Sequence, residues 1–66
     1  MRIASDIEVK FIRPGDVVLD NGEPVYVRSV KPGSLDLIVI TGVNMRGRQH
    51  VLRLDKQSTI KIVEEA

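Results

Sequence analysis

The 66-residue chain contains no cysteine and no tryptophan, and it has only one histidine, one tyrosine and one phenylalanine. Without cysteine no disulfide can form, which excludes the stapled scaffolds of small secreted proteins and leads us to expect a cytoplasmic protein. A single histidine without cysteine argues against a zinc site, so we expect no metal and no cofactor. Two aromatic rings are too few for a platform that stacks several bases. The domain must therefore be stabilised by packing, by strand pairing or by a partner chain.

Long hydrophobic runs are absent as well. The longest apolar run covers residues 37–40, far short of the roughly 20 residues that a membrane-spanning helix needs. The first residues include an arginine at position 2 and no apolar stretch of the kind found in signal peptides. We therefore expect no membrane association and a single domain over residues 1–66, with residues 64–66 frayed.

The residues that are abundant favour strands. Valine and isoleucine supply 17 residues, whereas alanine occurs only at positions 4 and 66. β-Branched side chains suit a pleated, half-buried surface, and no stretch repeats apolar residues at the spacing of a helix. We predict an all-β chain with short strands over residues 6–11, 16–19, 25–30, 35–41, 49–54 and 59–63.

Turn residues separate these strands at short intervals. Pro-Gly pairs within 13–16 and 31–34 predict type II turns, and Asn21-Gly22 predicts a tight hairpin. Residues 44–47 predict a looser loop, and residues 55–58 are compatible with a type I turn. Short strands at this spacing are typical of a sandwich or a small barrel. Because an immunoglobulin-type sandwich needs about 100 residues, the barrel is favoured.

Residues 13–30 read Arg-Pro-Gly-Asp-Val-Val-Leu-Asp-Asn-Gly-Glu-Pro-Val-Tyr-Val-Arg-Ser-Val. This order of turn, Gly-Asp-x-Val, glycine hairpin and Val-x-Val strand resembles the opening of SH3-like barrels of the KOW type. It is most similar to the N-terminal domain of elongation factor P, in which a Lys-Pro-Gly turn follows, as Lys31-Pro32-Gly33 does here. The resemblance implies a small SH3-like barrel of five or six short antiparallel strands that binds RNA or protein. The family's functional lysine after this turn has no counterpart, because Ser34 and Leu35 follow, so its ribosomal activity is not implied.

Acidic residues are absent between positions 36 and 55. This segment carries three arginines and the histidine, together with two side-chain amides that can hydrogen-bond bases. Guanidinium groups on a loop that contains glycine can meet phosphate oxygens. We therefore predict a nucleic-acid-binding site made of Arg46, Arg48, Arg53, His50, Asn44 and Gln49.

The same segment also has a structural interpretation. It can be a solvated hairpin whose arginines pair with acids on neighbouring strands, namely Asp36, Asp55, Glu64 and Glu65. A net charge of +1 for the whole chain is small for a nucleic-acid-binding protein. Both interpretations stay open from the sequence.

Tyr26 and Arg28 form a second candidate site. They alternate with Val25 and Val27 and so share one face of the predicted third strand. A tyrosine beside an arginine can stack a base or anchor a protein partner, and it can equally pack across strands at the barrel surface. We predict that this pair contacts a partner.

Two apolar patterns concern packing and association. Phe11 alternates in phase with Ile7 and Val9, which predicts that it lies in the core. The strand predicted over 35–41 is apolar on both faces, which indicates a central position, a bend in a barrel, or a contact between copies.

Catalysis has little support. His50 and the serines form no recognisable triad motif, so we expect no enzymatic activity. Asp16, Asp20 and Glu23 crowd around one hairpin, but their spacing matches no calcium loop, and we interpret them as turn-forming and solvated residues.

Three functions follow as hypotheses. The leading one is a non-catalytic SH3-like module that contacts RNA or a nucleoprotein complex of the translation or transcription apparatus. The second is a small protein-interaction adaptor of the kind that phages or mobile elements encode. The third is a structural subunit that self-associates through the 35–41 strand or through an open sheet edge.

Overall fold

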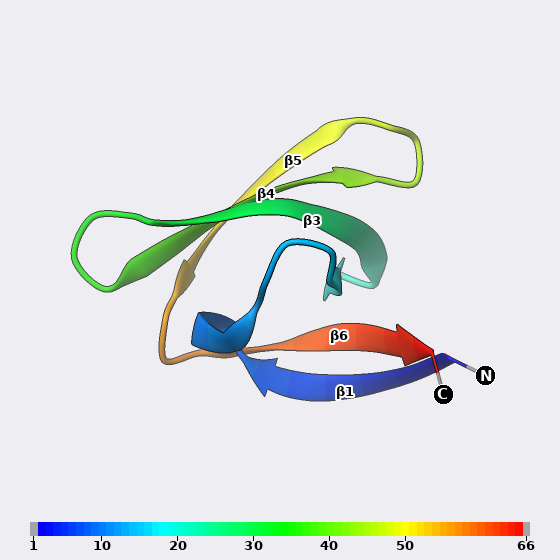
Figure 1. The fold of residues 1–66 in the computed structure, drawn as a ribbon, viewed down its shortest axis with the longest axis horizontal. Coiled ribbons are helices and arrows are strands. Elements are labelled where there is room, and N and C mark those ends of the chain that lie inside the picture. The colour runs from blue at the N-terminus through cyan, green and yellow to red at the C-terminus, as the bar shows by residue number, and fades with distance from the viewer. Residues whose placement is uncertain (1, 66) are drawn as a thin grey trace.

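The computed structural model describes residues 2–65, and the surroundings of the side chains from residue 4 to residue 64. Its elements are β1 (Arg2–Glu8), the 3-10 turn η1 (Val9–Phe11), β2 (Val17–Asp20), β3 (Glu23–Pro32), β4 (Leu37–Asn44), β5 (Gln49–Asp55) and β6 (Thr59–Glu65). The six strands form a single sheet with the order β1-β6-β2-β3-β4-β5 (Figure 1), and every pair is antiparallel. This architecture confirms the predicted all-β class with six short strands.

The sheet curls into a half-open barrel. Strand β5 lies at one edge and β6 lies next to the other edge, yet only residues 56–58 connect them. Such a link spans roughly 14 Å at most, so the two strands must meet at one corner. Two backbone hydrogen bonds of 2.9 Å hold this corner, from the Lys56 N–H to the Asp36 carbonyl and from the Val9 N–H to the Ser58 carbonyl. Among the described residues no ladder joins β1 to β5, so these strands remain the two edges.

Two predicted turns are confirmed by their backbone geometry. Asn21 and Gly22 both have positive φ, at 52° and 82°, as a two-residue type I′ hairpin requires. Gly15 has a φ of 99° and the Asp16 N–H donates to the Arg13 carbonyl at 3.1 Å, which is the type II arrangement.

The turn predicted over residues 31–34 is wrong in its position. Strand β3 continues through Pro32, and the chain reverses later, where the Leu37 N–H donates to the Ser34 carbonyl at 3.1 Å. Leu35 takes the positive φ of 54° and is 98% exposed, so it belongs to the turn and not to the following strand. Gly33 instead allows the Val39 side chain to pack closely against the backbone, since an added Cβ at position 33 would lie 3.1 Å from Val39 Cγ2.

Phe11 does not lie in the core, contrary to the prediction. Residues 9–11 form the 3-10 turn η1 instead of continuing the strand. With about three residues per turn, Val9 and Ile12 face the same side, and both are buried, whereas Phe11 is 56% exposed. The prediction rests on the two-residue alternation of a strand, whereas side chains in the 3-10 turn over residues 9–11 repeat every three residues.

The core lies inside the curl and consists of Val9, Ile12, Val18, Val25, Val27, Ile40 and Ile62. On β3 the inward residues are Val25 and Val27, followed by Val30 and not by Ser29. A bulge between Val27 and Ser29 shifts the register against β4 at this point. The extra residue changes the phase of the strand, so that Val30 returns to the core side.

Strand β4 is central, between β3 and β5, which explains why both of its faces are apolar. Strand β6 also extends further than predicted. Glu64 and Glu65 pair with Ile3 and Arg2 of β1, so the expected fraying is wrong for these two residues, and Ala66 lies outside the described residues. No helix in the described part of the chain is long and apolar enough to cross a membrane.

Candidate nucleic-acid interface

The outward side of β3, β4 and β5 carries residues from both candidate sites that the sequence singled out. Side chains alternate between the two faces of a strand, and residues opposite one another in a ladder share a face. The register therefore aligns three outward rows across the strands, which are Tyr26, Val43 and Gln49; Ser29, Thr41 and Val51; and Lys31, Val39 and Arg53. Tyr26 of one candidate site and Gln49 and Arg53 of the other thus share one face of the sheet.

This surface has an apolar middle and a basic border. Tyr26 is 48% exposed and Val51 is 43% exposed, while the valines of β4 between them are half-buried. Exposed basic side chains surround them on β3, on β5 and in the turn between β4 and β5. The residues that the register aligns are Tyr26, Lys31, Val39, Thr41, Val43, Gln49, Val51 and Arg53. Together with the exposed arginines that border them, Arg28 at the bulge and Arg46 and Arg48 at the β4–β5 turn, we call this surface the basic face.

Charge is strongly divided along the chain. Residues 28–53 hold five of the ten basic residues and only one of the nine acidic residues, a formal charge of +4. The remaining residues hold five basic and eight acidic side chains, a formal charge of −3. On the outward positions of β3, β4 and β5, Asp55 is the only acidic side chain. The small net charge therefore conceals a basic surface.

The turn that carries Arg46 and Arg48 is built by Asn44. Its Oδ1 accepts the backbone N–H groups of Arg46 and Arg48, each at 2.9 Å. Gly47, with a φ of 77°, completes the reversal and donates its N–H to the Asn44 carbonyl at 3.0 Å. Asn44 is only 7% exposed. This geometry does not support the prediction that Asn44 contacts bases, because its side chain holds the turn that presents the two arginines.

His50 lies on the opposite face of β5 from Arg53. The burial of β5 alternates, with His50, Leu52 and Leu54 on the covered side. Its Nδ1 lies 3.8 Å from Asp20 Oδ2, so it approaches the β2–β3 hairpin across the mouth of the barrel. His50 is therefore not part of the basic face, in contrast to its predicted place in the site.

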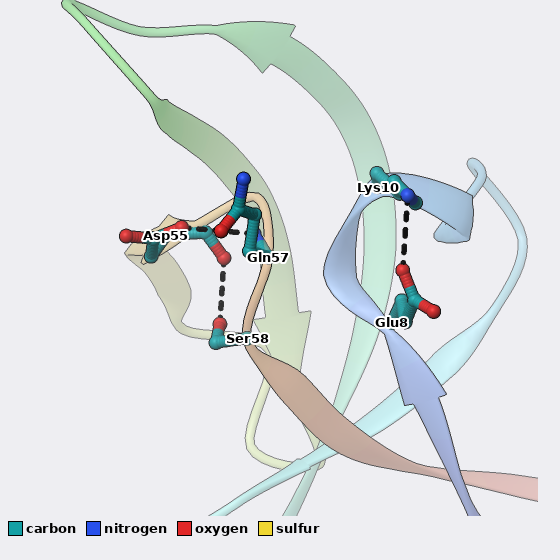
Figure 2. Close-up of polar contacts among 5 residues, drawn as sticks. All are labelled: Glu8, Lys10, Asp55, Gln57 and Ser58. Atoms are coloured by element: carbon teal, nitrogen blue, oxygen red, sulfur yellow. Dashed lines mark hydrogen bonds and ion pairs between the residues drawn. The ribbon is translucent and has the colours of Figure 1, made fainter.

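The arginines do not pair with the acids that the structural interpretation named. Among the described residues Asp36 pairs with Lys56 at 3.4 Å, and Asp55 Oδ1 accepts the Gln57 N–H at 2.8 Å within its own turn (Figure 2). No ion pair in this part of the chain joins an arginine to Glu64, and the side chain of Glu65 is outside the described set. No guanidinium group of the basic face is therefore paired with an acid among the described residues.

Sequence reasoning missed Lys31 and Val51 as members of this surface. Counting every second residue from Tyr26 places Lys31 on the inner side. The bulge beside Arg28 reverses that phase, so that Lys31 points outward beside Val39 and Arg53. Bulges leave no dependable signal in a single sequence, whereas the alternation of β5 alone was sufficient to place Val51 beside Arg53.

The acids of the β2–β3 hairpin are engaged separately. Asp16 Oδ2 accepts the Arg13 N–H at 2.9 Å, and Asp20 faces His50. Within the described residues no three histidine or carboxylate side chains come close enough together to hold a metal ion. Comparisons with protein-family models, with curated proteins and with solved structures find no match to this chain.

Proposed function

We propose that this chain is a non-catalytic binding module whose basic face contacts RNA, either free or within a nucleoprotein complex. One observation carries the proposal. Strand pairing brings Tyr26, Lys31 and Arg53 onto one face, and the exposed arginines of the β3 bulge and of the β4–β5 turn border it. No described acid pairs with an arginine of this surface. The resemblance of residues 13–33 to KOW-type barrels supports the same class of ligand.

The chemistry of the surface suits a single strand better than a duplex. Phosphate groups bind guanidinium groups through paired, charge-assisted hydrogen bonds, and the border of the basic face supplies these donors. The exposed ring of Tyr26 can stack on the flat side of one base, which a duplex keeps covered. Gln49, in the same row as Tyr26, offers a donor and an acceptor to a base edge. The half-buried valines between them exclude water from this contact.

The test is a titration of a short single-stranded RNA, followed by fluorescence anisotropy at low and moderate salt. We expect binding that weakens with salt, because each neutralised phosphate releases counterions. The double variant Arg46→Gln/Arg48→Gln removes two phosphate contacts. It should bind more weakly and lower the slope of log K against log salt by about 1.4, at roughly 0.7 per contact for single strands.

The matched control is Lys10→Gln/Arg13→Gln, which removes the same charge from exposed positions outside the basic face. It should retain wild-type affinity and slope. Absence of binding at low salt would overturn the proposal, and so would an equal loss of affinity in both double variants, because that result would reflect net charge alone.

A further inference from the structure

The edge of strand β5 is open from Gln49 to Arg53. The Asn44 N–H donates to the Arg48 carbonyl, and the Lys56 N–H donates to the Asp36 carbonyl, each at 2.9 Å. Even-numbered residues of β4 therefore direct their backbone groups toward β5. Hydrogen-bonded pairs alternate along an antiparallel ladder. The residues of β5 that exchange hydrogen bonds with β4 are therefore His50, Leu52 and Leu54. The N–H and C=O groups of Gln49, Val51 and Arg53 consequently point away from the sheet. The Asp55 carbonyl instead accepts the Ser58 N–H at 3.0 Å and the Ser58 hydroxyl at 2.6 Å.

Strand β5 lacks several of the devices that protect a sheet edge, although it carries the charged side chains of Arg53 and Asp55. The strand has seven residues, contains neither proline nor lysine, and keeps an unbroken register with β4. It is the outermost strand on its side of the molecule (Figure 1). At its centre Val51 is 43% exposed. The other edge differs, since β1 carries Asp6 and Glu8, two acids that would face each other between copies.

We propose that a second copy of this chain pairs its β5 antiparallel with β5, about a two-fold axis that passes through Val51. In this register Val51 faces Val51 of the second copy, and Gln49 faces Arg53. Asp55, the only acid on the outward positions of β3, β4 and β5, then reaches the turn of the other copy that carries Arg46 and Arg48. Apolar, polar and charged groups thus all meet complementary groups.

Neighbouring registers are less favourable. Sliding one strand by a single residue would place outward side chains against inward ones. An axis through Leu52 keeps the faces but sets the apolar Val51 against the charged Arg53. A shift that centres the axis on Arg53 would set two guanidinium groups directly opposite each other, which is destabilising. A two-fold axis at Val51 avoids all three, and it continues the sheet so that the two basic faces lie side by side on one surface.

Single cysteines test this register directly, because the natural chain has none. Residues opposite each other in a hydrogen-bonded pair have Cα atoms about 5.5 Å apart, within the range of about 4.4–6.8 Å that a disulfide accepts. Under mild oxidation without nucleic acid, Val51→Cys should link to itself. Gln49→Cys alone should not link, but should link to Arg53→Cys when the two are mixed. Ser34→Cys, in the exposed β3–β4 turn, measures links formed by random collision.

Sedimentation of the unmodified chain should show a monomer–dimer equilibrium that Val51→Lys shifts to monomer, because two ammonium groups would then meet at the axis. Val51→Cys that links no faster than Ser34→Cys would overturn the proposal, as would a chain that stays monomeric at millimolar concentration. A link between Val51→Cys and Arg53→Cys without self-linking of Val51→Cys would reject the register. Since no RNA is present, these outcomes are independent of the proposed function.

Discussion

The two halves of the curled sheet differ in whether their basic side chains pair with acids. In the half formed by β1, η1, β6 and β2, Lys61 lies 3.2 Å from Asp6 and Lys10 lies 3.1 Å from Glu8 (Figure 2). In the half formed by β3, β4 and β5, the arginines have no acidic partner among the described residues. The first half pairs two of its lysines with acids, whereas the second half leaves its arginines without an acidic partner among the described residues.

This difference concerns both the stability of the chain and the binding that we propose for it. Exposed ion pairs contribute only about 0.2–1 kcal/mol, so the paired half gains little stability from its charges. The uncompensated half loses equally little by leaving its arginines unpaired, and it retains a field that attracts anions. Substitutions in the two halves should therefore separate the two properties.

The largest effect is expected where β3 and β4 cross most closely, beneath the basic face. A Cβ at Gly42 would overlap the backbone carbonyl oxygen of Tyr26. Gly42→Ala should therefore force the strands apart and lower the free energy of unfolding by about 3 kcal/mol or more. Urea denaturation followed by circular dichroism measures this.

The control is Gly47→Ala, where an added Cβ meets no atom within 4 Å and only the positive φ of 77° is strained. It should lose about 1–2 kcal/mol. Equal losses at the two glycines would show that β3 and β4 can separate without strain, and that the basic face is less rigid than its geometry indicates.

The next effect concerns the turn of the basic face. Asn44→Ala leaves the N–H groups of Arg46 and Arg48 without their acceptor and should lower the free energy of unfolding by about 2 kcal/mol. Because the turn would no longer hold the two arginines, RNA affinity should also fall while the formal charge stays the same. Unchanged affinity in a folded Asn44→Ala variant would contradict the role of this turn.

A smaller effect of opposite sign is expected at Leu35. Its φ of 54° is strained for a leucine, and its side chain is 98% exposed, so it contributes little packing. Leu35→Gly should raise the free energy of unfolding by about 0.5–1 kcal/mol, because glycine adopts this conformation without strain. Thermal denaturation measures the shift, and a lower melting temperature would show that the leucine packs against the chain.

The smallest effect is expected in the paired half. Lys61→Gln breaks the contact with Asp6 and should lower the free energy of unfolding by less than about 1 kcal/mol. RNA affinity should remain at the wild-type value. A loss of affinity comparable with that of Arg46→Gln/Arg48→Gln would remove the distinction between the halves.

Local features were predictable because they depend on neighbouring residues. The Asn21-Gly22 hairpin and the Arg13–Asp16 turn follow from residues that tolerate a particular φ, and both were found as predicted. The turn after β3 was misplaced because Gly33 is required for a close contact with Val39, which only the folded chain creates. Phe11 was misplaced because a short 3-10 turn interrupts the alternation that the sequence displays.

The candidate site also has one part that the sequence predicts and another part that only the folded chain reveals. The absence of acids between positions 36 and 55 pointed to Arg46, Arg48 and Arg53 without any structure. The union of these arginines with Tyr26 required the pairing of β3, β4 and β5, and the inclusion of Lys31 required the bulge. The separation of His50 and Asn44 from the basic face likewise depended on which groups they meet across the fold.

The sequence alone thus determined the strand class, the tight turns and the division of charge, because these depend on composition and on residues a few positions apart. The tertiary structure decided which strands are edges, where the phase of β3 reverses and which side chains share the basic face. These outcomes depend on register and curvature, and both are set by contacts between residues that are distant in the sequence.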